Sequence, residues 1–186
     1  MISLQEYQDR LQDVRLLVTD VDGVLTPGTI LYGDGGLECK HFHVRDGVAM
    51  YLASQIGLRT AVITGRTSEA VARRFNELPV DAIRQGCLDK IKACAEIEAE
   101  FDLKPQQVAF LGDDLIDLPL IERVGLGITV ADGHSRLREC VDWVTRAEGG
   151  RAALREVVDD AITARDLWDQ VLEDYRSRLN SAPEDV

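Results

Sequence analysis

Basic residues are scarce in this chain of 186 residues, because 21 lysines and arginines stand against 33 aspartates and glutamates, a formal net charge of −12. Nucleic acids and anionic membranes both require basic protein surface, so neither is expected as a partner. No apolar run approaches the roughly 18 residues of a membrane span, and "MISLQEYQDR" lacks the pattern of a secretion signal. The four cysteines form no CxxC pair, which favours reduced thiols in a cytoplasmic protein.

Several common catalytic motifs are also absent. The chain has no GxxxxGK[ST], no GxSxG and no HExxH, so these nucleotide-binding, serine-hydrolase and zinc-protease patterns do not compete as explanations. His41, His43 and His134 lack the spacing of metal ligands, and His41 is expected on the surface of a hairpin. The chemistry must therefore come from other residue types.

Short apolar runs alternate with helix-like patterns along the chain. Alternation of this kind predicts an α/β fold with a parallel sheet and right-handed crossovers, in one domain over residues 1–186. The strand-like runs are 15–20, 59–65, 81–86, 107–113, 126–131 and 142–146. Helices are expected from an N-cap at Asp46 to Ile56, and over 68–78, 88–101, 118–124 and about 151–175, followed by a frayed polar tail from about 176 to 186.

One segment breaks this alternation. Residues 29–44 hold two strand-like stretches on either side of Gly33-Asp34-Gly35-Gly36. Asp-Gly between such stretches is a strong hairpin signal. We therefore expect a β-hairpin directly after the first strand.

Two aspartates, Asp20 and Asp22, follow the first apolar strand. In an extended segment these side chains point the same way, roughly 6–7 Å apart, at the sheet edge where α/β proteins bind ligands. One could act as a nucleophile, while the other moves a proton. A plain turn remains open, but a calcium loop does not, because it needs Asp or Asn where Val24 stands.

A second acidic cluster, Asp113, Asp114 and Asp117, follows another apolar run. Carboxylates from two strand ends, completed by water and substrate phosphate, are the ligands that Mg²⁺ prefers. Taken alone, this segment is more often a solvated loop. The two clusters together predict a divalent-cation site.

Thr64, Gly65 and Lys90 complete a possible phosphate site. A hydroxyl, free backbone N–H groups and an ammonium can hold phosphoryl oxygens. Separately these residues would be a strand-to-helix turn and a surface lysine. What favours the functional interpretation is that each follows a predicted strand, in sequence order.

These segments resemble a known family. "DVDGVLT", "TGR", Lys90 and "GDDLIDLP" are similar, in order, to the four motifs of the haloacid dehalogenase superfamily of phosphatases. Longer matches such as "HVRDG" and "DWVTRAEGGRAALREV", within about 12–165, resemble the cap-less branch that dephosphorylates 3-deoxy-D-manno-octulosonate 8-phosphate. The resemblance implies a Rossmann-like parallel sheet flanked by helices, with a β-hairpin flap and no cap domain. It also implies a Mg²⁺-dependent phosphomonoesterase of a small sugar-acid phosphate, in lipopolysaccharide precursor biosynthesis, assembled as a homotetramer.

The resemblance assigns roles at matching positions. Asp20 would be the nucleophile and Asp22 the general acid/base. The Asp20 carboxylate, the Asp22 carbonyl and Asp113 would bind Mg²⁺, while Thr64 and Lys90 would hold the phosphoryl group. The positions that match substrate-binding residues are His43, Arg45, Asp46, Gly47, Gly65, Arg66 and Arg74.

The chain departs from the branch at Tyr51, where a basic residue is usual, and at Ala152, where the branch often has glycine. These departures leave the chemistry untouched but bear on the substrate, so a phosphatase of a nonulosonate 9-phosphate remains an alternative. From a different class, a catalytically idle oligomerisation module is a second alternative. Arg66 favours the eight-carbon acid, since a nonulosonate phosphatase is expected to carry an acidic residue there. The other interpretation of Arg66 is a helix-start arginine paired with Glu69.

Overall fold

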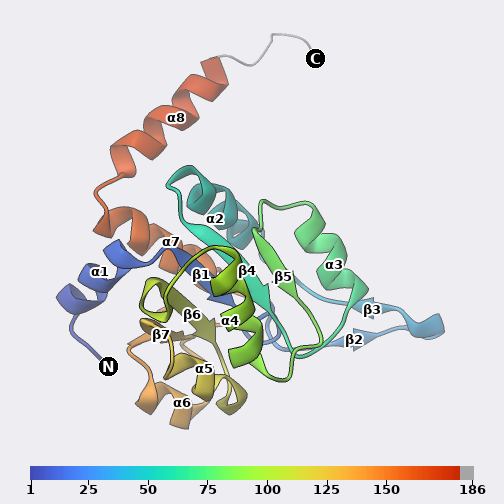
Figure 1. The fold of residues 1–186 in the computed structure, drawn as a ribbon. Coiled ribbons are helices and arrows are strands. Elements are labelled where there is room, and N and C mark those ends of the chain that lie inside the picture. Colours follow the sequence, from blue (N-terminus) through green and yellow to red (C-terminus); the bar gives the residue numbers. More distant parts are fainter. Residues whose placement is uncertain (181–186) are drawn as a thin grey trace.

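The computed structural model describes residues 1–180, and its main feature is a parallel sheet of six strands (Figure 1). Every neighbouring pair in this sheet is parallel, so all carboxyl ends meet at one edge. The strands lie in the order β5 (Ala82–Arg84), β4 (Arg59–Ile63), β1 (Leu16–Thr19), β6 (Val108–Gly112), β7 (Leu126–Thr129) and β8 (Trp143–Val144). All six predicted strands, and the α/β fold class with its parallel sheet, are confirmed.

Helices cover both faces of the sheet. Leu17 points into one apolar cluster and its neighbours Leu16 and Val18 into the other, because side chains alternate along a strand. The first cluster packs against α1 (Leu4–Asp13), α2 (Val44–Gln55), α3 (Glu69–Asn76) and α7 (Ala153–Ala164). The second packs against α4 (Lys90–Glu100), α5 (Leu118–Ile121) and α6 (Ser135–Cys140).

The two central strands, β1 and β6, are buried along their whole length. Burial on both faces explains their near-continuous apolar sequences. Polar side chains are therefore excluded until the strands end, and they gather at the carboxyl edge. The fold itself thus places the two acidic segments beside each other.

The predicted hairpin is present as β2 (Leu31–Tyr32) and β3 (Glu38–Cys39). Its turn contains Gly35 and Gly36 at φ +71° and +83°, a backbone conformation that favours glycine. This hairpin, residues 29–44, is called the flap below, and Figure 1 shows it projecting from the body beside α3. Its apolar side chains Leu31, Tyr32 and Leu37 are exposed.

The predicted N-cap of α2 is wrong. The cap is His43, whose Nδ1 accepts a hydrogen bond from the Arg45 backbone N–H at 3.2 Å, so the helix begins at Val44. Asp46 lies inside the helix and is buried. Sequence favours Asp over His at an N-cap, but here tertiary packing draws the Asp46 carboxylate to another element.

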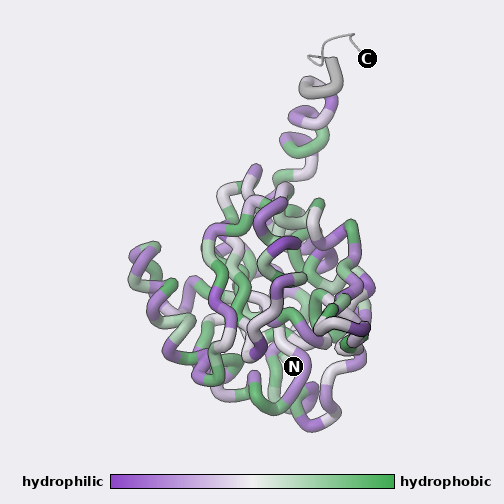
Figure 2. Tube along the Cα trace, turned by 90° about the vertical axis from the view of Figure 1, so that its right-hand side faces the viewer, coloured by the Kyte–Doolittle hydropathy of each residue, from purple (hydrophilic) through white to green (hydrophobic). Residues whose placement is uncertain are grey.

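The predicted last helix is two helices, α7 and α8 (Trp168–Asn180), separated at Asp166, which has φ +54°. Arg165 at this break donates to the carbonyls of Leu11, Val14 and Ile56, at the ends of α1 and α2. Figures 1 and 2 show α8 projecting from the body. The predicted tail is partly wrong, because 176–180 belong to α8, and 181–186 lie outside the described residues.

Two helices, α1 and α6, were not predicted from the sequence. The first buries only Tyr7 and Leu11, and the second only Leu137, so their apolar patterns are short. Over residues 1–180, no helix is both long and apolar enough to span a bilayer.

Candidate active site

Three predicted site residues meet at the carboxyl edge of the sheet. Asp20 follows β1, Thr64 follows β4 and Asp113 follows β6, and β1 pairs directly with both of the other strands. The loop after β1 is held to β6 by the Asp20 N–H, which donates to the Leu111 carbonyl at 3.0 Å. Parallel pairing in this register therefore explains why segments far apart in sequence share one site.

Lys90 forms the centre of a buried charge cluster. Its Nζ lies 2.6 Å from Asp20 Oδ2 and 2.5 Å from Asp117 Oδ1, and all three side chains are almost completely buried. Burial alone would lower the pKa of Lys90, but Asp20 and Asp117 raise it, so the ammonium keeps its charge. Burial raises the pKa of Asp20, and the negative charge of Asp117 adds to this rise, although the Lys90 ammonium acts to lower it.

Asp113 adds a third carboxylate to this cluster. Oxygens of Asp20, Asp113 and Asp117 all lie within 4.8 Å of one another. Burial and the nearby charges of Asp20 and Asp117 raise the pKa of Asp113 to about 8. The site therefore gathers more carboxyl groups than Lys90 can balance when they are ionised, and a bound cation would favour their ionised form.

The hydrogen bonds of Asp117 connect it to Lys90 and to the loop after β6. Its Oδ1 contacts Lys90, and its Oδ2 accepts from the backbone N–H groups of Asp113 at 2.9 Å and Asp114 at 3.3 Å. Asp117 thus fixes the loop after β6. Asp20 and Asp113, which directly follow β1 and β6, are the carboxylates expected from the sequence to hold a hard divalent cation, and they lie beside Asp117.

Gly23 lies in close contact with this cluster. Its φ is +89°, and a Cβ built there would lie 2.0 Å from Asp113 Oδ2. A Cβ on Gly149 would likewise lie 1.9 Å from the Gly23 carbonyl. Gly23 therefore lets the loop after β1 approach the acidic loop after β6, and Gly149 lets the loop after β8 approach the loop after β1.

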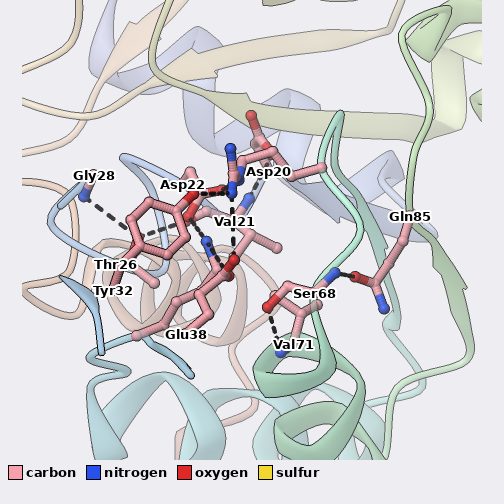
Figure 3. Close-up of polar contacts among 12 residues, drawn as sticks. Asp20, Val21, Asp22, Thr26, Gly28, Tyr32, Glu38, Ser68, Val71 and Gln85 are labelled. Carbon is pink, nitrogen blue, oxygen red and sulfur yellow. Dashed lines mark hydrogen bonds and ion pairs between the residues drawn. The ribbon is translucent and has the colours of Figure 1, made fainter. Parts of the chain in front are cut away.

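Asp22 turns toward the flap, away from the acidic cluster. Its Oδ1 accepts a hydrogen bond from Lys40, whose side chain is 0% exposed, and its Oδ2 lies 3.8 Å from Arg66 Nε. Figure 3 shows the flap residues Tyr32 and Glu38 beside Asp22. The flap thus contacts the active site within the same chain.

Arg66 also contacts the flap. Its Nη2 donates to the Tyr32 hydroxyl at 2.8 Å and to Glu38 Oε2 at 3.3 Å. Among the described residues its ion pairs are with Asp22 and Glu38, so pairing with Glu69 is wrong. Arg66 therefore lies at the mouth of the site, between the flap and the loop after β1.

Thr64 and Gly65 form the turn after β4. The Thr64 N–H donates to the Arg84 carbonyl at 2.9 Å, and its carbonyl accepts from the Cys87 N–H at 3.0 Å. These bonds tie the turn to the segment that leads into α4 and Lys90. Thr64 is buried, while Gly65 is half-buried.

The remaining predicted substrate residues form a second group on α2 and α3. Across residues 1–180, no hydrogen bond or ion pair joins His43, Arg45, Asp46 or Arg74 to the acidic cluster. Arg45 is exposed, and His43 caps α2.

Asp46 and its neighbours hold helices together. Asp46 Oδ1 accepts from the Arg155 N–H at 3.0 Å, near the start of α7, and burial raises the pKa of Asp46 to about 6. A Cβ on Gly47 would lie 2.5 Å from Arg74 Nη2, so glycine lets the arginine lie across α2. Arg74 also lies 3.7 Å from Glu77.

Three contributors were missed as site residues from the sequence, and a fourth, Asp117, was named in the second acidic cluster but given no role of its own. Its contact with Lys90 supplies that role. Lys40, Glu38 and Tyr32 carry no local signal, because only the folding of the flap over the sheet edge brings them to Asp22 and Arg66.

Comparison with known proteins identifies the family. Residues 80–150 match the haloacid dehalogenase-like hydrolase family. The chain is 43% identical over 157 residues to the 3-deoxy-D-manno-octulosonate 8-phosphate phosphatase KdsC of Yersinia pestis, covering 84% of each protein. The chain belongs to this phosphatase family. The Escherichia coli K12 protein of the same name is 41% identical over 161 residues, covering 87% of this chain and 86% of that protein.

A solved member of the phosphatase family has the same architecture. The crystal structure of the Moraxella catarrhalis 3-deoxy-D-manno-octulosonate 8-phosphate phosphatase superposes with a TM-score of 0.89 at 34% identity, covering 93% of this chain and 99% of that one. That protein was crystallised with a magnesium ion, a phosphate ion and a KDO molecule. The family resemblance and the Rossmann-like fold predicted from the sequence are therefore confirmed, and the chain is a hydrolase of the phosphatase class.

Proposed function

We propose that this phosphatase hydrolyses 3-deoxy-D-manno-octulosonate 8-phosphate to the free sugar acid and inorganic phosphate, with Mg²⁺ as cofactor. The observation that carries the proposal is the buried cluster in which Lys90 bridges Asp20 and Asp117 beside Asp113. The proposal is supported by the relatives of this chain, which are named as phosphatases of this substrate. The intact cluster argues against an idle oligomerisation module.

The reaction would proceed in two steps at Asp20. Its carboxylate attacks phosphorus, the bond from phosphorus to the sugar oxygen breaks, and Asp22 gives that oxygen a proton. Water then attacks the aspartyl-phosphate and gives a proton back to Asp22, and the bond from phosphorus to Asp20 breaks. Lys90, with Thr64, would hold the phosphoryl oxygens in both steps.

The donor set fits magnesium. Asp20 and Asp113 would hold the ion with the Asp22 carbonyl, and bound Mg²⁺ would neutralise charge on the phosphoryl oxygens. EDTA should abolish activity and Mg²⁺ should restore it, while Ca²⁺ should support it poorly because its longer, looser coordination misplaces the phosphoryl group. Full activity in a chelated sample would overturn the metal requirement.

Selectivity for the sugar acid would depend on Arg66. The phosphate end of any substrate meets Lys90 and Thr64, so discrimination must come from groups farther out. Arg66 is 45% exposed at the mouth of the site, and its guanidinium offers a fork for a carboxylate. In the free protein this fork is occupied by Glu38 and Tyr32, which the substrate would have to displace.

Phosphate release across a panel of sugar-acid phosphates tests the substrate. We expect the highest kcat/KM for the octulosonate 8-phosphate, and a preference for a nonulosonate 9-phosphate would establish the alternative. Arg66→Ala should lower kcat/KM for the octulosonate ester about 10-fold or more, which corresponds to the loss of one hydrogen bond to a charged group. Hydrolysis of a small aryl phosphate should change little, because it does not reach Arg66. Equal losses on both substrates would instead place Arg66 on the phosphate.

We further propose a homotetramer in the cytoplasm. The flap exposes 59% of Leu31, 65% of Tyr32 and 59% of Leu37, and such a small hairpin gains stability by packing against neighbouring copies. A neighbour at this position would also help to close the site. Light scattering at micromolar concentration should give a tetramer, and a fully active monomer would contradict this assembly.

A further inference from the structure

Four charged groups at the base of the flap form a closed ring of alternating sign. Lys40 contacts Asp22 and lies 3.6 Å from Glu38 Oε1, while Arg66 lies 3.3 Å from Glu38 Oε2 and 3.8 Å from Asp22 Oδ2. Glu38 and Lys40 come from the flap, and Asp22 and Arg66 come from the sheet edge. Each acid therefore meets both bases, and the flap is joined to the general acid/base.

The two bases of this ring differ in exposure. The Lys40 side chain is 0% exposed, whereas that of Arg66 is 45% exposed. A fully buried ammonium requires paired partners, and the ion pairs of Lys40 are with Asp22 and Glu38. The charge of Lys40 is thus paired within the ring, and its contact with Asp22 is more shielded from water than that of Arg66.

From this geometry we infer that Lys40 is a positioning residue for the reaction, because it holds the Asp22 carboxylate in the orientation needed for proton transfer. The inference rests on the proposed function in assigning proton transfer to Asp22. Lys40 acts through Asp22 and does not touch the phosphoryl group, which is the role of Lys90. It also makes the orientation of Asp22 depend on the position of the flap.

The two chemical steps depend differently on Asp22. Cleavage of the sugar ester needs a proton for an alkoxide leaving group, and hydrolysis of the aspartyl-phosphate needs a proton taken from water. Cleavage of p-nitrophenyl phosphate needs no such proton, because p-nitrophenolate leaves readily as an anion. A loosened Asp22 should therefore slow every step except the first step with the aryl ester.

The experiment compares Lys40→Met, which keeps the length of the side chain and removes its charge, with Lys40→Arg. For the octulosonate 8-phosphate we expect Lys40→Met to lower kcat about 10- to 100-fold, within the range that displaced acid–base groups cost, with KM changed less than about threefold. For p-nitrophenyl phosphate we expect a rapid burst of nitrophenolate, stoichiometric with enzyme, followed by slow turnover. Lys40→Arg should recover most of kcat.

The matched control is Lys104→Met, an exposed lysine just before β6 at the opposite end of that strand from the site. It should leave both substrates unaffected. Melting temperatures of all variants separate loss of folding from loss of positioning, since a burst requires a folded site.

Three results would overturn the inference. They are an unchanged kcat in Lys40→Met, a raised KM at constant kcat, and an equal slowing of the nitrophenolate burst and of later turnover. If the wild-type protein does not hydrolyse the octulosonate ester but does hydrolyse p-nitrophenyl phosphate, the proposed substrate is wrong. In that case the burst of Lys40→Met on the aryl ester still decides the role of Lys40.

Discussion

Replacing Asp113 with asparagine should stabilise the metal-free protein at neutral pH. The pKa of Asp113 is about 8 in the folded chain against an ordinary 3.8, because burial, Asp20 and Asp117 all disfavour its charge. When the pH is below the unfolded pKa of such a group, the group is protonated in both states and does not lower the free energy of unfolding. The cost in stability grows as pH rises from about 4 toward 8, since the unfolded chain ionises first.

The magnitude follows from linkage. At pH 7 the Asp113 carboxyl is ionised in the unfolded chain and protonated in the folded chain. Because pH 7 lies about 3 units above the unfolded pKa, the free energy of unfolding is lowered by about 4 kcal/mol, at 1.36 kcal/mol per unit. The Asp113 side chain is partly exposed, and water screens part of this cost. We therefore expect Asp113→Asn to raise the free energy of unfolding in EDTA by about 2–4 kcal/mol at pH 7, and by almost nothing near pH 4.

Urea unfolding in EDTA across this pH range is the assay, and Asp114→Asn is the matched control. Asp114 is the exposed neighbour and the smallest of the charges that raise the pKa of Asp113, so its substitution should change the pH dependence much less. Mg²⁺ at about 100 times its dissociation constant should stabilise wild type by about 2.7 kcal/mol and Asp113→Asn far less. A variant less stable than wild type at pH 7 in EDTA, or a difference that does not grow with pH, would refute the reasoning.

Three further variants test the account. Gly23→Ala should lower the free energy of unfolding by about 2 kcal/mol or more in chemical unfolding, because the new Cβ would collide with Asp113. The same collision should weaken Mg²⁺ binding measured by calorimetry, and normal metal affinity would contradict this close contact. Lys90→Met should lower kcat at least about 100-fold in phosphate-release assays, since it leaves Asp20 without its ammonium partner. Near-normal turnover would exclude Lys90 from the site. Arg165→Met should lower the melting temperature by about 4–12 °C with kcat unchanged, because the carbonyls at the ends of α1 and α2 lose a charged hydrogen-bond donor. An unaltered melting temperature would show that water replaces the guanidinium as donor.

The sheet could be predicted from the sequence because its strands are buried on both faces and read as apolar runs. Asp20 and Asp113 stand immediately after such runs, so their convergence followed from parallel pairing alone. The short helices α1 and α6 could not be predicted in this way, because each buries too few apolar side chains to make a clear period.

Residues that act across long distances in the chain were harder to predict. Asp46 was expected to cap its own helix, but its carboxylate meets the Arg155 N–H, 109 positions away. Lys40 reaches Asp22 only because the flap folds back over the sheet edge. Neither contact leaves a local pattern, since the partner is chosen by packing.

Trapping the covalent intermediate tests the central claim most directly. Enzyme mixed with Mg²⁺ and 3-deoxy-D-manno-octulosonate 8-phosphate is quenched during turnover, treated with borohydride, and mapped by peptide mass spectrometry. Borohydride reduces an acyl phosphate to an alcohol, so the account predicts homoserine in place of Asp20. An unmodified Asp20 in samples quenched during turnover, or reduction at another carboxylate, would contradict it.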